Sequence, residues 1–172
     1  MNIALPQAYL LGLIGLLSIV AVVVGRQVLR VRRQEGQLFD LERRCQASDA
    51  DAASLYELGS VQLDKRLFAQ AAASLKRAAK KANSEPPEAQ ALIENALGFC
   101  LAAQQNHNEA VRHYRLALKA REDYPVALNN LAFSLEKLQK GDEAVELYRK
   151  SLELEPGNRT ATRRLKLLRP KG

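Results

Sequence analysis

Two cysteines and two histidines are the side chains of this sequence best suited to catalysis or metal binding, and their spacing supports neither. Cys45 and Cys100 form no CxxC pair, and neither His107 nor His113 has the spacing of a zinc ligand. No glycine-rich phosphate loop and no paired-carboxylate motif accompanies them. We therefore predict a protein that is not an enzyme, with no catalytic residue, metal, cofactor or small-molecule substrate. We expect both histidines at the surface.

The amino-terminal element is apolar and uncharged. Residues 1–25 contain no Asp, Glu, Lys or Arg, and residues 8–25 form an unbroken run without a polar face. A helix of this length reaches ~27 Å at ~1.5 Å per residue, which is close to the hydrocarbon thickness of a bilayer. The sequence therefore predicts a transmembrane anchor at residues 1–25.

Basic residues follow the apolar run immediately. The four that we take as determinants of membrane topology are Arg26, Arg30, Arg32 and Arg33. Because the flank rich in Lys and Arg stays on the cytoplasmic side, we expect a single-pass protein whose carboxy-terminal part is cytoplasmic, or stromal in a plastid. Residues 26–50 are predicted to be a basic juxtamembrane helical linker, and whether it continues the anchor helix is left open.

The rest of the chain repeats itself at a constant offset. Leu97, Ala110 and Tyr114 recur as Leu131, Ala144 and Tyr148. A weaker copy lies upstream at a somewhat longer offset, with the additional residues near two consecutive prolines. Such a period indicates a stack of similar helical units, each of which buries its apolar face against the next.

A period of about 34 residues with Leu-Gly, Ala, an aromatic residue and a closing Pro resembles the tetratricopeptide repeat family. Pro156 is the closing residue of the last copy. The resemblance implies an all-α fold, in which the amino-terminal transmembrane helix precedes a right-handed α-solenoid. The predicted boundaries place three repeats within 51–157, at about 52–85, 91–124 and 125–158, and a capping helix with a basic tail at 158–172.

In this family the first helix of each hairpin lines a groove that binds peptides. Carried over by alignment, the groove residues expected here are Tyr56, Asn95, Phe99, Asn129, Asn130 and Phe133. Asn side chains can donate to and accept from a peptide backbone, and Phe rings can anchor apolar side chains. The alternative interpretation is that these residues only support packing between the helices.

The net charge of +7 invites a nucleic-acid interpretation. Six basic residues close the chain without an acidic one after Glu155, but no aromatic residue is interleaved with them and no nucleic-acid motif is present. We therefore expect no nucleic-acid partner. The basic tail suits either a solvated helix end or an anionic membrane surface.

The layout of a short protein with one amino-terminal anchor and three repeats resembles the thylakoid tetratricopeptide proteins that help photosystem I to assemble or to stay stable. Membership would imply a thylakoid location and photosystem I subunits or assembly intermediates as partners. The alternative is an adaptor of the bacterial plasma membrane serving envelope biogenesis, secretion or protein quality control. A self-associating structural membrane protein is a third class.

Overall fold

A computed structural model describes residues 4–46 and 50–168 of the chain, and the parts of the predicted domains at 1–3, 47–49 and 169–172 lie outside the described residues. The described residues form helices and no strand, which confirms the all-α prediction. The chain divides into two units, Met1–Arg43 and Arg44–Gly172, and each is described by itself.

The first unit contains one long helix. Helix α1 spans Ala4–Cys45 without interruption, so it passes through the residues predicted as anchor and on into those predicted as linker. Its segment Leu10–Arg30 has a mean hydropathy of 2.1, and it is long and apolar enough to cross a membrane. None of this segment is buried by the rest of the chain. A soluble helix would instead carry a polar face toward water.

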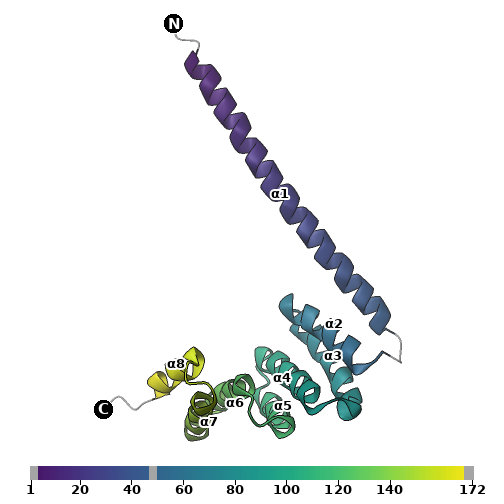
Figure 1. The fold of residues 1–172 in the computed structure, drawn as a ribbon, viewed down its shortest axis with the longest axis vertical. Coiled ribbons are helices and arrows are strands. Elements are labelled where there is room, and N and C mark those ends of the chain that lie inside the picture. Colours follow the sequence, from purple (N-terminus) through teal and green to yellow (C-terminus); the bar gives the residue numbers. More distant parts are fainter. Residues whose placement is uncertain (1–3, 47–49, 169–172) are drawn as a thin grey trace. The chain divides into compact units, whose positions relative to one another are not determined.

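The second unit is a series of helical hairpins (Figure 1). Its helices are α2 (Ala52–Asp64), α3 (Phe68–Lys81), α4 (Pro87–Ala103), α5 (His107–Ala120), α6 (Pro125–Lys137), α7 (Gly141–Leu154) and α8 (Arg159–Leu168), with the short 3₁₀ helix η1 (Ala82–Ser84) after α3. Each helix packs against the next one along the chain. The second helices of the three hairpins are α3, α5 and α7, and they begin at aligned positions of the repeat. The longer offset separates the first two starts, and the offset of about 34 residues separates the last two.

Local signals explain where these helices begin. The carboxylate of Asp51 accepts a hydrogen bond from Ser54 N at 2.7 Å and caps α2. Asn106 caps α5 in the same way, with its oxygen 3.3 Å from Glu109 N. Helices α4 and α6 begin with Pro87 and Pro125, whose ring suits the first helical position because no backbone N–H is needed there.

The turn between the two helices of each hairpin has the same unusual conformation. Arg66, Gln105 and Gln139 all have positive φ, at 60°, 65° and 62°. In the first turn Leu67 N donates to the Gln62 carbonyl at 2.8 Å, and the same bond recurs in the other two turns. These are Schellman motifs, in which a left-handed residue ends the helix. Glycine adopts this conformation without cost, so three non-glycine residues here store strain.

Small residues let the two helices of a hairpin approach closely, as the repeat pattern predicts. A Cβ added to Gly59 would lie 2.6 Å from Leu75 Cγ, and one added to Gly98 would lie 2.7 Å from Tyr114 Cε1. The rings of Tyr114 and Tyr148 are fully buried in the core. Together with the small buried residues of the facing helices they form continuous packing through α4 to α8.

Candidate protein-binding surface

Helices α4 and α6, the first helices of the second and third hairpins, and the last helix α8 carry exposed apolar side chains in register. Phe99 on α4, Phe133 on α6 and Leu167 on α8 follow one another at the repeat offset and are 42%, 38% and 64% exposed. Leu92 and Val126 precede the two phenylalanines by about two helical turns, so they lie on the same faces. We call these five residues the apolar ladder.

Sequence reasoning had singled out only the two phenylalanines of this ladder. Leu92, Val126 and Leu167 were missed, although the repeat offset was available as a signal: Leu92 aligns with Val126, and Leu167 aligns with Phe133. The sequence indicates a cap at residues 158–172 rather than the first helix of a further unit, and a cap gives Leu167 no binding role. Exposed apolar side chains in such a series are typical of a recognition surface.

Each phenylalanine of the ladder also has a partner in the preceding hairpin. The rings of Phe99 and Phe68 are 6.4 Å apart between centroids and tilted by 59°. Phe133 and His107 are 6.5 Å apart at 72°, close to an edge-on arrangement. One side of each ring therefore stabilises the contact between hairpins, while a substantial part of it stays accessible to a ligand.

Cations gather around Phe133. Lys137 Nζ lies 5.3 Å from the ring centroid and the Arg164 guanidinium carbon lies 5.2 Å from it. Arg164 also forms an ion pair with Glu136, which accepts a second hydrogen bond from the Tyr148 hydroxyl at 2.7 Å. The hydrogen bond with Glu136 raises the pKa of Arg164. This network joins α6, α7 and α8 next to the ladder.

The three predicted asparagines bond within the chain. Asn130 Nδ2 donates to Asn95 Oδ1 at 3.0 Å, and Asn95 Nδ2 lies 3.4 Å from the Tyr124 hydroxyl. Asn129 is only 8% exposed, and its Nδ2 donates to Asn158 Oδ1 at 3.1 Å. These contacts tie neighbouring units together. They give each asparagine a structural role beside any part that it plays toward a ligand.

Tyr56 and the four arginines are placed as follows. Tyr56 is half-buried on α2 and packs against the cluster formed by Ala71, Leu75, Leu97 and Cys100. Arg26, Arg30 and Arg32 are exposed on α1, whereas the side chain of Arg33 lies outside those that the structure describes.

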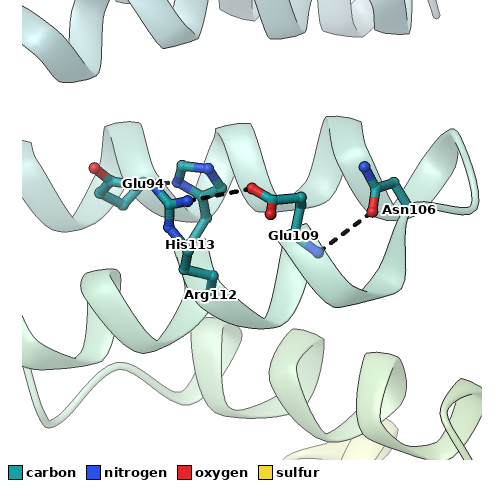
Figure 2. A network of polar contacts seen from close by, with 5 residues as sticks. All are labelled: Glu94, Asn106, Glu109, Arg112 and His113. Carbon is teal, nitrogen blue, oxygen red and sulfur yellow. Dashed lines mark hydrogen bonds and ion pairs between the residues drawn. The ribbon is translucent and has the colours of Figure 1, made fainter.

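The expectation that both histidines lie at the surface is wrong. His107 is only 9% exposed, because as the first residue of α5 it packs against Phe133 of the next hairpin. Burial, assisted by Lys137, lowers its pKa. His113 is covered as well, with its side chain 12% exposed, and its Nδ1 lies 2.6 Å from Glu94 Oε2 on α4 (Figure 2).

No group of three or more His, Cys, Asp or Glu side chains within the described ranges is arranged to hold a metal ion. Both cysteines are buried and free, and burial raises the pKa of the Cys100 thiol to about 11. Such a thiol is almost entirely protonated at neutral pH and is a poor nucleophile. The apolar ladder itself offers apolar and aromatic contacts, with cations near Phe133.

Comparison with known families and relatives agrees with the repeat fold. The sequence model of the family described as Tetratricopeptide repeat matches residues 125–158. The chain is 29% identical over 93% of its length to a chloroplastic protein of Arabidopsis thaliana, the tetratricopeptide repeat domain-containing protein PYG7, and it spans 53% of that relative. It is 28% identical to a protein named ycf37 in Guillardia theta, over 98% of this chain and 94% of the relative.

Solved structures share the fold. MamA superposes with a TM-score of 0.71 at 21% identity, covering 81% of this chain and 79% of MamA. The first repeat domain of Spaghetti (RPAP3), solved with an HSP90 peptide, gives 0.62 at 23% identity over 69% of this chain and 90% of that domain. At these identities the likeness concerns the arrangement of the helices.

Proposed function

Because this chain is a tetratricopeptide repeat protein, we propose that it is a membrane-anchored scaffold that binds a segment of another protein on its apolar ladder. The repeats face the cytoplasm or stroma, and the partner is a subunit or assembly intermediate of photosystem I in the thylakoid membrane. The observation that carries the proposal is the set of five exposed apolar side chains in register on α4, α6 and α8.

The anchor is supported by the side chains of α1. Large apolar residues from Leu10 to Leu29 are about half or more exposed, with Leu11 at 70%. Exposing such a surface to water costs free energy, roughly 25 cal/mol per Å² of apolar area. The hydrocarbon of a bilayer would cover it without this cost. A helix also satisfies its own backbone hydrogen bonds inside lipid.

The proposed orientation is supported by four arginines that crowd the carboxy-terminal end of the apolar segment, Arg26, Arg30, Arg32 and Arg33. Reporter domains fused to the carboxy terminus, one active only in the cytoplasm and one only after export, test this directly. We expect activity of the cytoplasmic reporter alone. A translocated carboxy terminus, or full-length protein in the soluble fraction, would contradict the proposed topology.

The binding surface is tested by truncating the ladder. Phe99→Ala combined with Phe133→Ala removes two anchors, and truncation of central interface aromatics costs about 2 kcal/mol or more each. Because these rings also contact Phe68 and His107, the helical content of the variant must be checked by circular dichroism. A folded variant that retains the partner as well as wild type would refute the role of the ladder.

The photosystem part of the proposal rests on the layout of one apolar helix followed by three hairpins. The chloroplast location in the name of the Arabidopsis relative supports it. Deleting the gene in the native host should lower photosystem I relative to photosystem II, and wild type but not the ladder variant should restore it. An unchanged ratio would favour the other class, an adaptor in a bacterial plasma membrane.

A further inference from the structure

A hollow lies between α3 and α5, and none of its lining residues belongs to the apolar ladder. One cavity of about 600 Å³ has walls from these two helices and a floor from α4. A neighbouring cavity of about 300 Å³ extends it toward the end of α3. Ala79, Glu94 and Leu116 line both, so the two are continuous. We call the combined space the α3–α5 groove.

The groove is open because α3 carries small residues where the other second helices carry larger ones. Ala72 aligns with Val111 and Val145 at the two repeat offsets. In the same way, Ala79 aligns with a leucine in both later hairpins, Leu118 and Leu152. The fold therefore accommodates larger side chains at these positions, and the alanines of α3 leave more of the hollow open.

The floor of the groove has a polar pair at a position that is apolar in the other hairpins. Glu94 aligns with Leu55 and Leu128, which are 0% and 1% exposed. Its carboxylate pairs with the imidazole of His113, and Figure 2 shows the two side chains reaching each other from α4 and α5. Such a pair costs desolvation, so packing alone does not account for it.

The wall of the groove shows the opposite change. Leu116 is 39% exposed, whereas the equivalent positions hold the charged Arg77 and Lys150. An apolar residue is thus presented to the hollow where the other hairpins carry a cation. Together with the alanines of α3, Leu116 gives the hollow an accessible apolar lining.

Basic side chains surround the groove. Lys76 and Lys80 stand on α3, and Lys119 stands on α5, all exposed. Arg112 also lines it and pairs with Glu109 at 3.5 Å (Figure 2). After that pairing the three lysines leave the rim with net positive charge, which favours an acidic occupant.

We propose that the α3–α5 groove binds an amphipathic helix of a partner protein, with an apolar stripe against the alanines and Leu116 and with acidic residues facing Lys76, Lys80 and Lys119. A helix lying in a hollow between two helices is a common mode of recognition. Glu94 and His113 would meet a polar group in the middle of that stripe and fix its register. This inference rests on the scaffold function but uses a surface separate from the apolar ladder.

The probe is a fluorescein-labelled synthetic helix with Ala and Leu on one face and Glu on its flanks, titrated by anisotropy with the full chain in mild detergent. Its controls are the same helix with Lys in place of Glu and a scrambled sequence of equal composition. We expect the acidic helix to bind at least tenfold more tightly than either control, with an affinity that falls as salt is added.

Filling the groove tests its location. Ala72→Val with Ala79→Leu introduces the residues that α7 carries, so the hairpin should fold, and binding should weaken at least tenfold. The Phe99→Ala and Phe133→Ala variant should bind the acidic helix as wild type does. If instead the ladder variant loses the helix and the filled variant keeps it, the groove inference fails while the scaffold function stands.

A second variant separates binding from folding. Glu94→Leu with His113→Leu copies Leu128 and Leu147 of the third hairpin. Its melting temperature should equal or exceed that of wild type, because apolar residues replace a desolvated pair, while the acidic helix binds more weakly. Unchanged binding in this variant would remove the pair from the proposal. Concentration-dependent dimers that the filled groove abolishes would assign the groove to a second copy and overturn the inference.

Discussion

At the scale of single residues, His107 occupies a site built for an aromatic ring. Its equivalent in the first hairpin is Phe68, and each packs against the phenylalanine of the following first helix. No hydrogen-bond partner for either ring nitrogen of His107 occurs among the described residues. A buried polar group without a partner costs about 1–3 kcal/mol, so this histidine weakens the fold at its own position.

We predict that His107→Phe stabilises the repeats by about 1 kcal/mol at neutral pH and more in mild acid. The pKa of His107 is lowered in the folded chain, so the unfolded chain binds its proton first as the pH falls below 6.5. The stability that wild type loses there should be retained by the variant. Urea unfolding followed by circular dichroism at pH 7 and pH 5 measures this, with His107→Gln as control.

An equal loss of stability between pH 7 and pH 5 in wild type and His107→Phe would contradict this account.

The surroundings of the two histidines explain why their burial could not be predicted from the sequence. The spacing of the repeat places His107 in a turn between helices and His113 on a mostly exposed second helix. In the structure His107 packs against Phe133 and His113 pairs with Glu94, each from another helix. The repeat spacing does not specify these contacts.

At the scale of elements, the three turns between paired helices share a conformation that suits glycine. We predict that Gln139→Gly, which relieves φ of 62°, raises the free energy of unfolding by about 1 kcal/mol. Gln139→Ala is the matched control, since alanine also lacks the long side chain but keeps the strain. Thermal unfolding of both variants checks the prediction, and an equal gain in both would show that the backbone conformation is not the cause.

Helix α8 depends on Asn158 at its start. Asn158 Oδ1 accepts a hydrogen bond from Ala161 N at 3.0 Å, so it caps the helix, and it also accepts from Asn129 Nδ2 at 3.1 Å. Asn158→Ala should destabilise the last hairpin by about 2 kcal/mol, because it removes the cap and leaves the buried amide of Asn129 without its partner. In this variant, hydrogen exchange should become faster than in wild type for the amides of α8, and this increase should be larger than any in α4.

Asn158→Asp keeps the capping oxygen and should restore most of that protection. If α8 exchanges as slowly in Asn158→Ala as in wild type, the capping account is wrong.

The contact between Asn129 and Asn158 also marks a limit of what the sequence predicts. The repeat offset aligns Asn129 with Asn95 and Asn158 with Tyr124, and Asn95 does bond to Tyr124, but the offset does not indicate that a capping asparagine takes the place of the tyrosine.

At the scale of the whole molecule, the helices were largely predictable and the surfaces were not. The Leu, Ala and Tyr spacing defines the core of the later hairpins, because burial constrains residue type at those positions most strongly. Exposed positions are free of that constraint, so residue type alone does not mark Leu92 and Leu167, and only their alignment with Val126 and Phe133 at the repeat offset does. The α3–α5 groove could be recognised only once the positions of the side chains that line it were known.

The central claim is that the repeats hold a photosystem I component through the apolar ladder while α1 keeps them at the membrane. Affinity purification of the tagged full-length chain from native membranes in mild detergent, with bound proteins quantified by mass spectrometry, tests it most directly. We expect photosystem I subunits to be enriched with wild type and to fall to background with the folded Phe99→Ala and Phe133→Ala variant. Photosystem I subunits at background level with wild type, or equal enrichment with both proteins, would contradict the account.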